Sequence, residues 1–156
     1  MSESHLDPKN SLGFLAWKVS RVAANDLAAR FSAAGVAVTV EQWRALIPLY
    51  HCDGLPQGKL CELLNQEKTG VSRLVAGLEK HGLLSRKSGK IDRRIKRLFI
   101  TEAGRALIDS TLDIVRESKE ALVKGVDAEE LAVCRRVLWH ILQPVFDREC
   151  GCGPTE

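Results

Sequence analysis

Two short apolar helix faces, set on either side of a polar pair of residues, constrain the fold of this chain more than any other feature. The apolar positions recur at helical spacing in two groups: Leu60, Leu63 and Leu64, then Val71, Leu74, Val75 and Leu78. Asn65 and Gln66 lie between the groups and suit a turn better than a helix interior. The pattern therefore predicts a helix, a turn and a second helix.

The segment after the second helix favours a β-hairpin. Gly82 offers a left-handed stop to the helix. The chain then runs through Leu83 and Leu84 into a basic stretch, and returns through Leu98 and Ile100. The predicted fold class is mainly α with a small β-hairpin, an α+β arrangement.

Charge is distributed unevenly along the chain. The whole chain carries a net charge of +3, with 23 basic and 20 acidic side chains. Residues 55–105 alone hold twelve basic and five acidic side chains, so this part is +7 and the rest is −4. A basic patch on a helix-turn-helix is expected to face a polyanion such as DNA. A merely solvated surface loop is the alternative, and seven basic residues against one acidic residue between Ser85 and Leu98 disfavour it.

Two stretches resemble a known family. DRRIKRLFITEAG, residues 92–104, is similar to the wing motif of the MarR family of bacterial transcription regulators. VSRLVAGLEKHGLLSR, residues 71–86, resembles the recognition helix of that family and its run into the wing. Two places depart from the family pattern. The loop at residues 88–91 lacks the Pro that is common there, and Phe99 stands where the family usually has a polar residue. The resemblance implies a winged helix-turn-helix with terminal dimerisation helices.

Further helices are expected on both sides of this element. Ser11 is expected to cap a helix that runs to about Ala33 and stops at Gly35. A capping box of Thr39 and Gln42 opens the next helix, which Pro48 should kink or end early.

Two long helices are expected to follow the hairpin. The first begins at Thr101 and Glu102, keeps one apolar face, and breaks near Gly125. Asp127 caps the last helix, which carries a heptad-type seam: Leu131, Cys134, Leu138, Ile141 and Val145. Such a seam serves either internal packing or a partner helix, and the resemblance implies the second use, in a homodimer.

The chain is expected to be one intertwined domain with four segments. Residues 1–35 form an N-terminal dimerisation helix, 36–104 the DNA-binding region, 105–149 the C-terminal dimerisation helices, and 150–156 a Cys/Gly tail. The sequence has no run of eighteen apolar residues and no basic-then-apolar leader. We therefore expect a soluble, cytoplasmic protein with no membrane partner.

The residues expected to contact DNA belong to two groups. The amino end of the second short helix supplies Lys68, Thr69, Ser72 and Arg73, where an arginine can bind guanine through two hydrogen bonds. The hairpin supplies Lys87, Lys90, Arg93, Arg94 and Lys96. Asp92 is expected to orient one of the two neighbouring arginines, and the resemblance implies that the other enters the minor groove; which does which stays open. Plain solvated charges are expected at Lys59, Lys80 and Arg105.

Cysteine chemistry gives two open alternatives. The chain has five cysteines, an odd number that disfavours a disulfide framework. Cys61 and Cys134 are interpreted as buried filler. Cys150 and Cys152, on a Gly-rich tail, either sense an effector, an oxidant or a soft metal ion, or form an uninvolved tail. The histidines show no metal-binding spacing, so neither a preformed metal site nor a cofactor is expected.

The sequence contains no phosphate loop, nucleophile elbow or metal-ligand motif, so an enzyme is not expected. The favoured function is a homodimeric, sequence-specific regulator of transcription that represses at an inverted-repeat operator in double-stranded DNA. A small-molecule, redox or metal signal would modulate its binding. Two alternatives from other classes remain: a winged-helix module that binds protein, and a thiol or metal sensor that uses the Cys150 and Cys152 pair.

Overall fold

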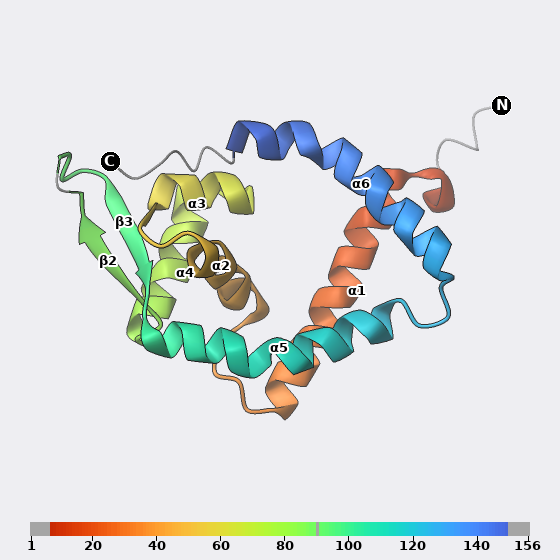
Figure 1. The fold of residues 1–156 in the computed structure, drawn as a ribbon, viewed down its shortest axis with the longest axis horizontal. Coiled ribbons are helices and arrows are strands. Elements are labelled where there is room, and N and C mark those ends of the chain that lie inside the picture. Colours follow the sequence, from red (N-terminus) through yellow and green to blue (C-terminus); the bar gives the residue numbers. More distant parts are fainter. Residues whose placement is uncertain (1–6, 90, 150–156) are drawn as a thin grey trace. The chain divides into compact units, whose positions relative to one another are not determined.

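The computed structural model describes residues 7–89 and 91–149, which are mostly helical with one small sheet, as predicted (Figure 1). The elements follow in this order: η1 Pro8–Asn10, α1 Leu12–Ala33, α2 Val40–His51, β1 Leu55–Pro56, α3 Gln57–Leu64, α4 Lys68–Lys80, β2 Leu84–Ser88, β3 Lys96–Ile100, α5 Glu102–Leu122 and α6 Ala128–Glu149. The chain forms two compact units. The first comprises α1 and residues 112–124, and the second comprises residues 41–111 and α6. Every described helix is too short or too polar to cross a lipid bilayer.

The capping residues predicted from the sequence begin helices α1 and α6 in the structure. The Ser11 hydroxyl accepts the backbone N–H of Phe14 at 3.2 Å and begins α1. Gly35, with φ of +69°, follows the end of that helix. The Asp127 carboxylate accepts the N–H of Glu129 at 2.9 Å and begins α6. Both predicted starts are confirmed, because each side chain satisfies an N–H that the first helical turn leaves unpaired.

Helix α2 continues through Pro48 and ends at His51, so the expected early end is wrong. A proline inside a helix removes one backbone hydrogen bond. Leu46 and Leu49 on either side of it are fully buried in the core. Burial of two leucines contributes several kilocalories per mole, roughly 1.5–3 for each, which offsets the lost bond.

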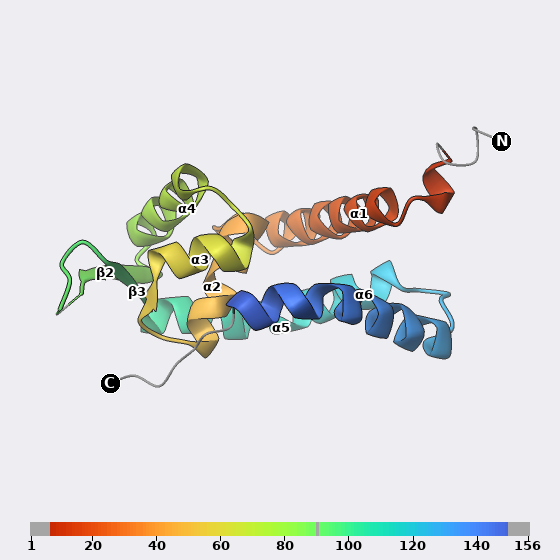
Figure 2. The ribbon, with the colours of Figure 1, turned by 90° about the horizontal axis from the view of Figure 1, so that it is seen from above.

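Helices α3 and α4 form the predicted helix-turn-helix (Figure 2). Asn65 ends α3 in the left-handed conformation, with φ of 48°, and its N–H donates to the Glu62 carbonyl at 2.9 Å. The inner faces of the two helices bury the predicted apolar residues: Leu60, Val71, Val75 and Leu78. Leu74 is only half-buried.

The sheet has three strands in the order β1-β3-β2, and both pairs are antiparallel. The hairpin of β2 and β3, which we call the wing together with its loop at residues 89–95, was predicted; β1 was not. In register, Leu84 lies opposite Ile100 and Arg86 opposite Leu98. Strand β1 pairs Leu55 with Leu98. Two residues, one of them a proline, give no detectable strand periodicity.

The end of the wing is fixed to α5 through Thr101 and Gly104. The Thr101 hydroxyl donates to the Gly82 carbonyl at 2.7 Å and accepts the N–H of Gly104 at 3.1 Å. The Thr101 N–H donates to the Leu83 carbonyl at 3.0 Å. A Cβ at Gly104 would lie 2.2 Å from that same carbonyl oxygen, so only glycine allows this approach.

Polar contacts also connect α2 to α5. The Tyr50 hydroxyl donates to the Asp109 carboxylate at 2.8 Å, which raises the pKa of Tyr50. The Arg105 guanidinium donates to the Tyr50 carbonyl at 3.2 Å and lies 3.9 Å from Asp53. Arg105 is therefore not the plain solvated charge that was expected. Lys59 likewise pairs with Glu62 at 2.9 Å, one helical turn away.

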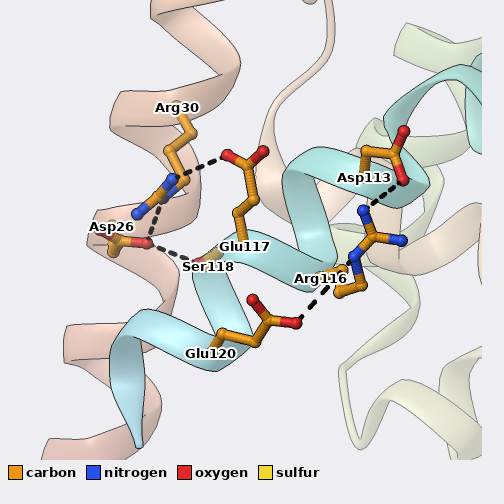
Figure 3. Close-up of polar contacts among 7 residues, drawn as sticks. All are labelled: Asp26, Arg30, Asp113, Arg116, Glu117, Ser118 and Glu120. Carbon is orange, nitrogen blue, oxygen red and sulfur yellow. Dashed lines mark hydrogen bonds and ion pairs between the residues drawn. The ribbon is translucent and has the colours of Figure 1, made fainter. Parts of the chain in front are cut away.

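In the first unit, polar side chains of α1 and α5 meet (Figure 3). The buried Ser118 hydroxyl donates to Asp26 at 2.6 Å, and the same carboxylate oxygen accepts from Arg30 Nε at 2.8 Å. A second nitrogen of Arg30 lies 3.4 Å from Glu117. Helix α5 does not bury a purely apolar face: Leu112 is 54% exposed, while the polar Thr111 and Ser118 are buried.

Candidate nucleic-acid interface

Helix α4 exposes its amino-terminal side chains on the face away from the core. Lys68, Thr69 and Arg73 are exposed, while Val71 and Val75 are fully buried. Helical spacing puts Thr69 and Arg73 on the side of the helix opposite Val71 and Val75, whereas Lys68 is the first residue of α4. Three of the four residues expected to contact DNA on this helix are thus open to a ligand.

Ser72 is the exception, because it is half-buried and engaged. Gln57, the first residue of α3, donates from Nε2 to the Ser72 hydroxyl at 3.0 Å. The other amide atom, Gln57 Oε1, is buried without a hydrogen-bond partner. Sequence reasoning missed Gln57, since a glutamine that opens a short helix carries no recognisable signal. Ser72 keeps one donor, its hydroxyl proton.

Two of the wing lysines, Lys87 and Lys96, lie near the loop end of the strands. Ser88 pairs with Lys96 in register, and Lys96 Nζ donates to the Ser88 hydroxyl at 2.8 Å. The Lys87 ammonium lies 4.9 Å from the centre of the Phe99 ring. This cation–π contact holds the aliphatic part of Lys87 over the sheet while the side chain stays exposed.

The wing loop presents Arg93 and Arg94, both exposed. Asp92 accepts the backbone N–H of Arg94 on its carboxylate at 2.9 Å. Among the described residues Asp92 forms no ion pair with either guanidinium, so it shapes the loop backbone instead of pairing with an arginine side chain as expected. Lys90 lies outside the described residues.

Two other basic residues of the wing have polar partners within the protein. Arg86 pairs with Glu79 and connects β2 to the last turns of α4. Arg97 donates to the Gly54 carbonyl at 3.0 Å. We use the name basic face for six exposed cations of α4 and the wing: Lys68, Arg73, Lys87, Arg93, Arg94 and Lys96.

The cysteines give little support to a sensor. Cys150 and Cys152 lie outside the described residues. Cys61 is half-buried, and Cys134 is exposed, so the interpretation of Cys134 as buried filler is wrong for a single chain. Its helix face is left open by the rest of the monomer. Within residues 7–89 and 91–149, no three histidine, cysteine or acidic side chains gather into a potential metal site.

Comparison with known proteins agrees with this geometry. Residues 38–96 match the model of the MarR family. Over 94 residues the chain is 33% identical to an uncharacterized HTH-type transcriptional regulator of Bacillus subtilis, YdgJ, an alignment covering 60% of this chain and 55% of that protein. The chain thus spans about half the length of this curated relative.

Solved structures share the fold over most of the chain. A MarR family transcriptional regulator from Silicibacter pomeroyi is 26% identical with a TM-score of 0.72, covering 89% of this chain and 92% of its own. MepR of S. aureus, solved in complex with DNA, is 25% identical with a TM-score of 0.73, covering 86% of this chain and 98% of its own. The resemblance stated from the sequence is confirmed, and so is the winged helix-turn-helix fold.

Proposed function

We propose that the chain is a member of the MarR family and that it is a sequence-specific DNA-binding regulator of transcription that acts as a homodimer. The basic face carries this proposal. Its six cations are exposed on one helix-turn-helix and its wing. Exposed cations are the groups that exchange counterions for phosphates.

Each part of the basic face suits a different groove. A helix fits the major groove, so α4 would present Arg73 and Thr69 to base edges, and Lys68 to a phosphate. The two wing arginines are exposed in the wing loop and would enter a minor groove, where negative potential is concentrated. The related MepR was solved with DNA bound, which supports this assignment of the same fold.

Exposed apolar residues support the homodimer. Helix α1 exposes Leu12, Leu15, Val19 and Val22, and α6 exposes Val137, Ile141, Leu142 and Val145. Contiguous apolar faces of this kind on a soluble chain usually mark an interface. A two-fold dimer would place two copies of α4 about 34 Å apart, one turn of DNA, and would favour an inverted repeat. Residues 36–104 would then read DNA while the terminal helices dimerise.

Variants on α6 test the dimer. Ile141→Asp places a charge on the exposed apolar face and is expected to shift the chain from dimer to monomer in sedimentation equilibrium. Arg136→Glu, a charge change on the same helix, is the control and should leave the dimer intact. A dimer that survives Ile141→Asp would remove α6 from the interface.

Regulation by a signal belongs to the same proposal. The dimer would have one conformation that binds DNA and another that does not. A signal molecule changes operator affinity only if its own affinities for these two conformations differ. A regulator that covers promoter DNA, in the cytoplasm of a bacterium, would act as a repressor. No catalytic role is proposed.

The deciding experiment is a salt titration of binding to the DNA upstream of the gene, with a random duplex of equal length alongside. Preference for the upstream DNA and a steep fall of affinity with salt are expected. Arg93→Glu with Arg94→Glu should abolish the preference, whereas Lys119→Glu on α5 should not. Equal and weak binding to both duplexes by the intact dimer would instead favour a winged-helix module that binds protein.

A further inference from the structure

The wing loop carries an apolar residue that no internal contact explains. Ile91 is 103% exposed, the largest value among the exposed apolar side chains that the structure describes. Most other exposed large apolar side chains of the described residues lie on α1, α5, α6 or the turn between α5 and α6. Outside these elements, the described residues expose only one more, Ile95, at 44%. The DNA-binding half therefore buries its apolar residues everywhere except in the wing loop.

Backbone contacts hold this loop, and the side chain of Ile91 does not take part in them. The Gly89 N–H donates to the Ile95 carbonyl at 2.8 Å, and the Ile95 N–H donates to the Asp92 carbonyl at 3.2 Å. A Cβ at Gly89 would lie 2.6 Å from the Asp92 carbonyl oxygen, so the loop closes tightly on itself. Since the loop has its own hydrogen bonds, Ile91 is presented to solvent without support from the core.

We propose that Ile91 is an apolar contact of the wing with the minor groove, packing against deoxyribose and base edges beside the arginines. This inference rests on the proposed function. Arg93 and Arg94, two and three residues further on, would bring the loop to the DNA. The walls of the minor groove are sugars with apolar carbon surfaces, and proteins that bind there often insert an isoleucine, leucine or phenylalanine.

The two kinds of side chain contribute in distinguishable ways. Arginines release counterions from phosphates, so their share of the affinity falls as salt rises. Burial of an isoleucine removes apolar surface from water and depends little on salt. Ile91 therefore supplies a share of affinity that persists at high salt.

The test compares three variants on an operator duplex by fluorescence anisotropy over a range of salt concentrations. Ile91→Ser is expected to weaken binding about tenfold, as for an isoleucine largely buried on binding, with an unchanged salt slope. Ile95→Ser, the matched control in the same loop, should stay within about twofold. Arg93→Gln with Arg94→Gln should reduce the slope by about one per lost phosphate contact.

Base analogues place the contact in the groove. Operators carry either a G·C or an inosine·C pair at each position beneath the wing; the two pairs differ only in the guanine amino group, which lies in the minor groove. The affinity ratio of wild type to Ile91→Ser should change between these duplexes. An unchanged ratio at every position, or wild-type affinity of Ile91→Ser, overturns the inference. A wild type that binds no operator would overturn the proposed function itself, which is a separate result.

Discussion

The indole N–H of Trp43 on α2 donates a hydrogen bond of 2.9 Å to the hydroxyl oxygen of Thr111 on α5. Both side chains are buried, and Thr111 Oγ1 also lies 2.9 Å from the Leu107 and Ile108 carbonyls of its own helix. The hydroxyl thus satisfies a buried donor on one helix while it donates its own proton within the other. This contact fixes the rotation of α2 relative to the first half of α5.

Thr111→Val keeps the shape of the side chain and removes the acceptor. The buried Trp43 N–H then loses this acceptor, and the free energy of unfolding is expected to fall by about 1–3 kcal/mol. Urea unfolding at a fixed protein concentration measures the change, because a dimer's stability depends on concentration. Ser110→Ala, next to it on the exposed side of α5, should change stability by less than about 0.5 kcal/mol. Equal effects of both variants would show that the Trp43 contact contributes nothing.

Gly104→Ala should destabilise the protein. The added methyl group would meet the Leu83 carbonyl at 2.2 Å and Ile100 Cγ1 at 2.8 Å, so α5 must shift. A loss of about 1–3 kcal/mol is expected from overpacking. Gly58→Ala on α3 meets nothing within 4 Å, and should leave stability unchanged or raise it by up to about 1 kcal/mol. Thermal unfolding of the two variants gives the comparison, and similar transitions would contradict the close approach at Gly104.

The ion pair of Glu79 and Arg86 predicts that removing the negative charge of Glu79 weakens DNA binding. Removing an acidic charge beside DNA normally strengthens binding, and Glu67→Gln at the start of α4 is expected to do so. Glu79→Gln also removes a negative charge, but it releases Arg86 and with it the contact between α4 and β2. Affinity for the operator is therefore expected to fall severalfold. Stronger binding by both variants in the same titration would show that the pair does not position the wing.

The contacts of Asp26 predict a pH dependence of stability. The hydrogen bond from Ser118, followed by that from Arg30, holds the pKa of Asp26 below its ordinary value of 3.8. A carboxyl whose pKa is lower in the folded protein stabilises it above the unfolded pKa, and this contribution is lost as the pH falls through the folded value. The melting temperature of Asp26→Asn should thus lie below that of wild type at pH 6, and the gap should narrow below about pH 4.

Ser118→Ala is the companion variant, because it removes the main cause of the shift. In that background, Asp26→Asn should produce a smaller gap at pH 6. A gap that stays constant from pH 6 to pH 3 would exclude Asp26 as the titrating group.

The sequence predicted the elements whose limits depend on local chemistry. Ser11, Asp127 and Gly82 act through their own backbone surroundings, and residue type is enough to identify them. The turn at Asn65 follows the same logic. The exposed cations of α4 and the wing were predictable because charged side chains stay in water unless something binds them.

Other features depend on tertiary contacts that no local pattern records. Thr111 and Ser118 occupy the buried side of α5 because Trp43 and Asp26 supply their hydrogen-bond partners. A search for apolar periodicity does not detect either residue, because both are polar. The contact of Gln57 with Ser72 depends on how α3 packs against α4, which the sequence pattern does not give. Arg86 and Arg97 count toward the basic charge of residues 55–105. Their partners, Glu79 on α4 and the Gly54 carbonyl, became visible only in the structure.

The contacts of Thr101 and Gly104 change what the family motif means. Thr101 joins the Gly82 carbonyl to the start of α5, and Gly104 leaves space for the Leu83 carbonyl. Both residues make close contacts within the protein, so the Thr-x-x-Gly part of the motif describes how the end of the wing is attached to α5. In evolutionary terms, a descendant of this chain that lost every exposed arginine would still need these two residues to fold. A sequence comparison that relies on these two residues therefore identifies the fold and not the ligand.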